Sequence, residues 1–128
     1  MPITPDDLLT LAENILTARA NSEVNYRNSA TRSYYSIFHK CQPISDRIRA
    51  VPPKDIKGSH AKIFWKLKNH SDPAIARLGK LLFDGRAKRR HADYDLLRPF
   101  NKGDAEYLLG LASRVKTIVA QLPPNLSP

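Results

Sequence analysis

Apolar residues recur at helical spacing in five segments of this 128-residue chain, and prolines or capping residues separate the segments. No segment shows the alternation of apolar and polar residues that is typical of strands. Each segment therefore predicts a helix with one buried face, and a chain of this length can bury the core of one domain. The sequence predicts an all-α protein that folds as an antiparallel bundle of about five helices.

Residues that favour helix starts stand before each apolar segment. A side-chain oxygen before the first turn accepts from a backbone N–H, and proline is well tolerated at the first helical position. The predicted starts are Thr4 with Pro5, Ser22, Gly58 with Ser59, Asp72 with Pro73, and the capping box Asn101 with Asp104.

Prolines also predict where helices stop. Pro43 should kink or end the second helix, because proline lacks the N–H that continues the backbone ladder. Val51-Pro52-Pro53 favours extended backbone, so residues 50–58 should form a loop. A single domain is expected over residues 1–122, followed by a disordered tail over 123–128.

Basic residues outnumber acidic ones and gather in one part of the chain. The net charge is +9, and about half of it lies between Arg77 and Lys102, which hold eight basic and three acidic residues. Such a surface favours polyanions such as RNA. The chain lacks an apolar run long enough for a membrane, and a lone Cys41 fits a reducing cytoplasm, so a cytoplasmic protein without membrane contact is expected.

Metal and cofactor chemistry find little support in the sequence. The one cysteine and four histidines lack the paired spacings of metal ligands, and Gly-rich phosphate loops and Gly-x-Ser-x-Gly motifs are absent. We therefore expect no metal and no cofactor. The main candidate for function is the basic stretch from Gly85 to Tyr94.

Three stretches together resemble a known family. They are Ala-Thr-Arg-Ser-Tyr-Tyr-Ser-Ile-Phe-His over 30–39, Gly-Ser-His over 58–60, and Arg-Ala-Lys-Arg-Arg-His-Ala-Asp-Tyr over 86–94. In order and spacing they resemble the small prokaryotic HEPN domains, and the resemblance covers nearly the whole chain.

Ribonucleases of that family carry an arginine, four to six further residues, and a histidine, which matches Arg86 and His91. The resemblance implies a homodimer of a toxin or antiphage type, which cleaves RNA without metal and leaves a 2′,3′-cyclic phosphate. Histidine would carry the proton, and the guanidinium would stabilise charge on the phosphorane oxygens. The residues expected to assist are Arg89, Asp93 and Tyr94, with Lys88, Arg90 and Arg98 as RNA-binding cations.

Helix geometry sets a condition on this catalytic pair. Residues five apart on a helix point about 140° from one another, so Arg86 and His91 of one chain poorly enclose a phosphate. Two chains meeting at this helix end would supply a composite cleft. On the same helix Arg89 and Asp93 stand at i and i+4, which predicts an ion pair.

Other interpretations of the same residues stay open. A non-catalytic module that binds RNA, a nucleotide, or a partner such as a nucleotidyltransferase or antitoxin is favoured by Ala87 and by the Ala-Asp-Tyr ending over 92–94. A purely structural adaptor with a basic helix end is a third. Arg32 and His39 also satisfy the motif count, but a local structural role is favoured there, as it is for His60.

Overall fold

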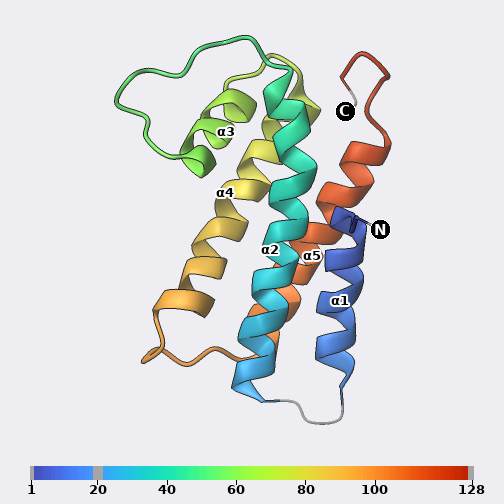
Figure 1. The fold of residues 1–128 in the computed structure, drawn as a ribbon, viewed down its shortest axis with the longest axis vertical. Coiled ribbons are helices and arrows are strands. Elements are labelled where there is room, and N and C mark those ends of the chain that lie inside the picture. Colours follow the sequence, from blue (N-terminus) through green and yellow to red (C-terminus); the bar gives the residue numbers. More distant parts are fainter. Residues whose placement is uncertain (1, 19–21, 127–128) are drawn as a thin grey trace.

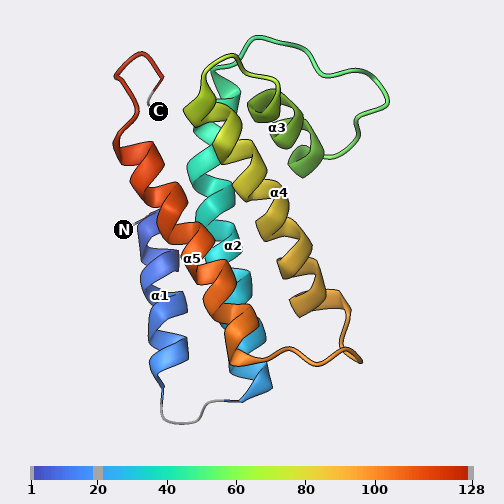
Figure 2. The same cartoon turned by 180° about the vertical axis from the view of Figure 1, so that it is seen from behind.

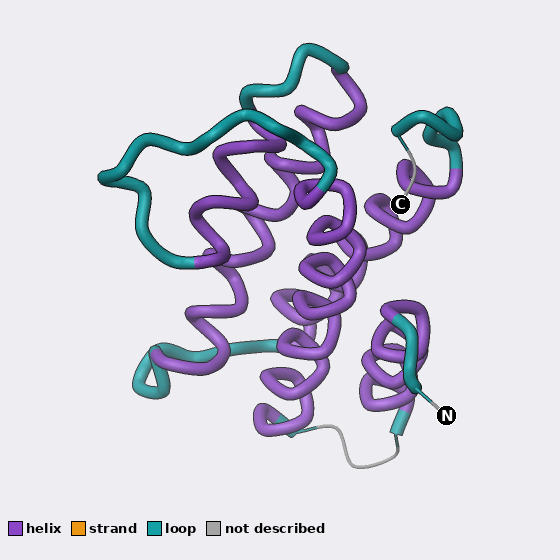
Figure 3. Tube along the Cα trace, turned by 45° about the horizontal axis from the view of Figure 1, so that its top comes forward, coloured by secondary structure: helices purple, strands orange, loops and turns teal. Residues whose placement is uncertain are grey.

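The protein is all-helical in the computed structural model, which describes residues 2–18 and 22–126 (Figures 1 and 3). No strand occurs among these residues, so the predicted fold class is confirmed. The five helices are α1 (Pro5–Thr17), α2 (Glu23–Asp46), α3 (Ser59–Lys68), α4 (Pro73–Tyr94) and α5 (Lys102–Ala120).

Helix α2 is the centre of the bundle and contacts each of the other four helices. Helix α2 runs antiparallel to α1 and α4, and α5 runs antiparallel to α4, with α1 and α5 on one flank of α2 and α4 on the other (Figures 1 and 2). The short α3 packs on the first half of α4. The second half of α4, which carries the basic stretch, therefore extends beyond α3.

Small residues on α2 allow these close contacts. Ser29, Ser33 and Ser36 are all buried, and the Ser29 hydroxyl donates to the Ala12 carbonyl of α1 at 2.9 Å. Serine in a helix interior can satisfy its hydroxyl on a backbone carbonyl while leaving little volume between the helices. The largest fully buried apolar side chains are Tyr34, Ile37, Leu67, Ile75, Leu78, Leu82, Phe100, Leu108 and Val115.

The predicted helix starts are confirmed. Thr4 and Asn101 form complete capping boxes with Asp7 and Asp104, and the Asp72 carboxylate accepts from two backbone N–H groups of the first turn of α4. Gly58 caps α3 without a side chain, at a φ of 88° that favours glycine.

Pro43 does not end α2, which continues to Asp46. The proline itself is exposed, while Ile44 and Ser45 directly after it are buried. Packing of this last turn against the core outweighs the loss of one backbone hydrogen bond.

Residues that follow α5 also pack against the core. Leu122 follows α5 and is buried, and Leu126 packs partly buried against the core. Residues 127–128 of the predicted tail lie outside the described residues, as do residues 19–21 between the first two helices.

Two helical glycines should respond oppositely to alanine. A Cβ on Gly79 would lie 2.8 Å from the backbone nitrogen of Lys68, whereas a Cβ on Gly110 meets nothing within 4 Å. We expect Gly79→Ala to lower the free energy of unfolding by about 1–2 kcal/mol, because α3 must move away. Gly110→Ala should raise it by about 0.5–1 kcal/mol through helix propensity. Urea unfolding followed by circular dichroism measures both, and a stabilised Gly79→Ala variant would contradict the packing of α3 on α4.

Candidate functional site at the end of α4

The basic stretch begins where α4 leaves the core. Gly85 packs against α2 and α5, and a Cβ there would lie 3.2 Å from the methyl carbons of Ile37 and Leu108. Glycine therefore lets the three helices meet at this level. The helix continues as predicted through the following cations to Tyr94.

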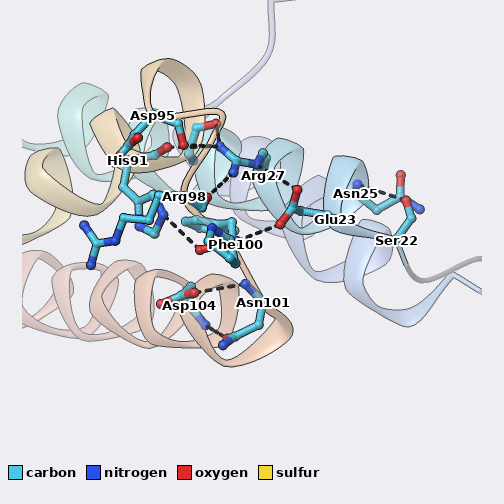
Figure 4. A network of polar contacts seen from close by, with 12 residues as sticks. Ser22, Glu23, Asn25, Arg27, His91, Asp95, Arg98, Phe100, Asn101 and Asp104 are labelled. Carbon is cyan, nitrogen blue, oxygen red and sulfur yellow. Dashed lines mark hydrogen bonds and ion pairs between the residues drawn. The ribbon is translucent and has the colours of Figure 1, made fainter.

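Arg27 of α2 binds the carboxyl end of α4 (Figure 4). Its Nη1 donates to the carbonyls of His91, Ala92 and Asp95 at 3.1, 2.9 and 3.2 Å, and its Nη2 donates to the Arg98 carbonyl at 2.6 Å. The last carbonyls of a helix lack partners within the helix and carry partial negative charge. A single guanidinium thus satisfies the end of α4 and fixes the loop after it.

Glu23 completes this attachment one turn earlier in α2. Its Oε1 accepts from the Phe100 N–H at 2.8 Å, and its Oε2 lies 3.7 Å from the Arg27 Nε. Phe100 is 2% exposed and lies beneath the Arg27 guanidinium, 5.6 Å from it. The sequence reasoning missed this pair, although Glu23 and Arg27 stand at the i, i+4 spacing of helical ion pairs.

We call one face of the basic stretch the His91 side. His91 is 8% exposed, its ring lies edge-on to Phe100 at 5.0 Å, and its Nε2 is 3.1 Å from the Pro99 carbonyl oxygen. A carbonyl can only accept, so Nε2 carries a proton and donates it there. His91 borders an open pocket of about 340 Å³, whose other lining residues are Asp84, Ala87, Lys88, Arg98 and Tyr107.

The cations on the His91 side are only partly available. Lys88 is paired with Asp104 of α5 at 2.9 Å, whereas Arg98 is exposed. Burial alone would raise the pKa of Asp104, but the N–H of Asn101 and the ammonium of Lys88 outweigh it and lower that pKa. Of the predicted RNA-binding cations, Arg90 and Arg98 thus present free charge at the surface, and Lys88 holds α4 to α5.

The opposite face, which we call the Arg86 side, is formed by Arg86, Arg89 and Asp93 of α4. The predicted ion pair is confirmed, since Arg89 Nη1 lies 3.3 Å from the Asp93 carboxylate. That carboxylate also accepts from the Thr31 hydroxyl of α2. Arg89 is 7% exposed and lies within 5.1–5.7 Å of three tyrosine rings, those of Tyr34, Tyr35 and Tyr94.

A tyrosine–histidine pair completes the Arg86 side. The fully buried Tyr34 hydroxyl is hydrogen-bonded to Nδ1 of His60, and the two rings stack at 5.6 Å. Phe38 packs on the same imidazole at 4.4 Å. Burial raises the pKa of Tyr34, so its hydroxyl stays protonated. Burial, and then the charges of Arg86 and Arg89, lower the pKa of His60, which favours the neutral ring.

The two predicted catalytic residues therefore lie in different surroundings within one chain. Arg86 acts electrostatically on Tyr34 and His60, while His91 contacts the loop after α4. This agrees with the angle of about 140° expected for residues five apart. The sequence reasoning gave His60 a structural contact and did not connect it with Arg86. The two residues lie on different helices, α3 and α4, whose arrangement follows only from the packed bundle.

No protein-family model, curated protein or solved structure matches this chain. The HEPN resemblance accordingly stays a prediction. Over residues 2–18 and 22–126, no three histidine, cysteine or acidic side chains gather as a metal site would require. None of the helices in that part of the chain is both long and apolar enough to cross a bilayer.

Replacing Arg27 should destabilise the fold strongly. Arg27→Met leaves four backbone carbonyls without their charged donor, and we expect the free energy of unfolding to fall by about 2–4 kcal/mol. Arg32→Met is the matched control, because it removes the same charge from α2 at a side chain that makes no hydrogen bond to any residue of the described ranges 2–18 and 22–126. Urea unfolding of both variants tests this, and equal losses would show that Arg27 has no special role.

The ionisation of His60 should be visible in solution. We expect its imidazole to titrate below the ordinary pKa of about 6.5. Because folding lowers the pKa of His60, the unfolded chain binds more protons than the folded chain just below pH 6.5. The contribution of His60 to the free energy of unfolding is therefore fully present above that pH and is lost as the pH falls. NMR titration of the ring carbons measures the midpoint, which Arg86→Gln should raise. A wild-type midpoint at or above 6.5 contradicts the lowered pKa of His60.

Proposed function

We propose that the protein is a HEPN-like helical module that binds RNA through the basic end of α4, without using Arg86 and His91 as a catalytic pair. This is the non-catalytic alternative of the sequence analysis. It is supported by the surroundings of His91 and by the distribution of free cations.

The surroundings of His91 carry the proposal. A histidine that takes a proton from the ribose 2′-OH needs a free ring nitrogen within hydrogen-bond reach of the substrate. Here the Nε2 proton is bound to the Pro99 carbonyl, so only Nδ1 is left to accept a proton, and the ring that carries it is 8% exposed and packs against Phe100. The loop that covers it is held by Arg27.

The free cations favour a polyanionic partner. Arg90, Arg98 and Lys102 are exposed around the end of α4, and the protein carries a net charge of +9. Exposed arginines contact phosphates through paired donors and release counterions on binding. These contacts position a nucleic acid without requiring a particular base sequence.

Binding of a short single-stranded RNA should be strongly salt-dependent. We expect its affinity to fall as salt rises from 50 to 200 mM, and each of Arg90→Gln and Arg98→Gln should reduce the salt slope by about one. Lys116→Gln, an exposed position on the far half of α5, is the control for net charge. Fluorescence anisotropy measures the three variants, and salt-independent or undetectable binding excludes the proposed function.

Cleavage is tested in the same reaction with EDTA present. We expect wild type and His91→Ala to leave the RNA equally intact, because His91 serves the fold. Cutting by the wild type that is abolished by both His91→Ala and Arg86→Ala would instead support the composite ribonuclease site of a homodimer.

A further inference from the structure

We propose that Arg86 and His60, with Arg89 behind them, form a binding site for one phosphate group. This deepens the proposed function, because the phosphate would belong to a bound RNA or nucleotide. The site draws on three helices: the Tyr34 hydroxyl of α2 is bonded to His60 of α3, the Tyr34 ring lies 5.1 Å from the Arg89 guanidinium of α4, and Arg86 lies one turn before Arg89 on the same face of α4.

Arg86 has a charge that nothing in the described part of the chain neutralises. It makes no hydrogen bond and no ion pair there, and its Nε is buried without an acceptor. The Asp93 carboxylate on this face is already shared by Arg89 and Thr31. A guanidinium with an unpaired buried donor is costly to the fold unless an acceptor arrives from outside.

Arg89 adds a second positive charge that cannot move away. Tyrosine rings surround it, it is 7% exposed, and its Nε also lacks an acceptor. On this face the single carboxylate of Asp93 therefore offsets only one of the two positive charges of Arg86 and Arg89. The Arg86 side keeps an excess of positive charge in a partly buried place, where electrostatic attraction is weakly screened.

His60 supplies a neutral donor beside these charges. Stacking on Tyr34 and Phe38 fixes the ring, and the protonated Tyr34 hydroxyl donates to Nδ1. The proton of the neutral imidazole then resides on Nε2, for which no partner is observed among the described residues. An anion bound at this position accepts from Nε2 and offsets the repulsion of both arginines, so it favours proton uptake by the ring.

The chemistry of these groups selects a phosphate. Arg86 and His60 offer donors and no acceptor, which excludes a cation. A guanidinium presents two parallel N–H groups that match two oxygens of a phosphate, and the second arginine favours a compact anion with high charge. The His91 side offers no comparable site, since Lys88 is already paired with Asp104.

Calorimetric titration with AMP and with adenosine tests the site. We expect AMP to bind and adenosine to bind far more weakly, because only the phosphate reaches Arg86. Arg86→Gln should weaken AMP binding about tenfold or more, whereas Arg86→Lys keeps the charge and should retain part of the affinity. Arg77→Gln removes the same charge from the other face of α4, beside α5, and should leave AMP binding unchanged.

A second readout separates binding from folding. Addition of AMP to the wild type should raise the pKa of His60 in NMR titrations, and it should not do so in Arg86→Gln. Thermal unfolding establishes that both glutamine variants are folded. The proposal is overturned if adenosine binds as well as AMP, or if Arg86→Gln and Arg77→Gln bind AMP equally.

Competition with RNA identifies the source of the phosphate. If a 5′-phosphorylated tetranucleotide displaces AMP and its 5′-hydroxyl counterpart does not, the site takes a terminal phosphate; displacement by both assigns it to the backbone. Either result supports the phosphate site. If neither tetranucleotide displaces AMP, the proposal that the bound phosphate belongs to RNA is overturned. Loss of RNA binding with intact AMP binding refutes only the proposed function, whereas salt-dependent RNA binding without AMP binding refutes only this inference.

Discussion

The guanidinium of Arg27 holds the carboxyl end of α4 against α2, and the arrangement of the basic stretch depends on it. Four backbone carbonyls converge on this one side chain, and Glu23 fixes the loop behind it (Figure 4). A basic helix end repels itself and exposes carbonyls that need donors. Arg27 supplies those donors from a neighbouring helix, and Arg90 of α4 remains exposed to solvent.

This attachment gives the two faces of α4 different roles. On one face the His91 ring packs edge-on against Phe100, and its Nε2 donates to the Pro99 carbonyl of the loop after α4. On the other face Arg86 and Arg89 gather beside Tyr34 and His60 with a single carboxylate between them. The first face has its polar groups largely paired, and the second does not. The unpaired buried donors of Arg86 and Arg89 therefore favour the second face for the proposed phosphate site.

Much of the fold could be predicted from local signals. The capping residues Thr4, Asp72 and Asn101 begin helices as predicted, because caps act within one turn. Pro43 does not end α2, because tertiary packing of the next turn outweighs a local preference. The ion pair of Arg89 with Asp93 followed from helix spacing, but the contacts of Arg27 and of His60 join residues far apart in sequence and follow only from the packed bundle.

Under the proposed function, the Arg86 side meets the ligand, while His91 serves the fold. NMR spectra of the four imidazoles, recorded with EDTA during titration with a short 5′-phosphorylated RNA, test it most directly. We expect the signals of His60 to shift with bound RNA and those of His91 to stay in place. Shifts of His91 without shifts of His60, or a ring Nε2 of His91 that exchanges its proton freely with solvent, would contradict it.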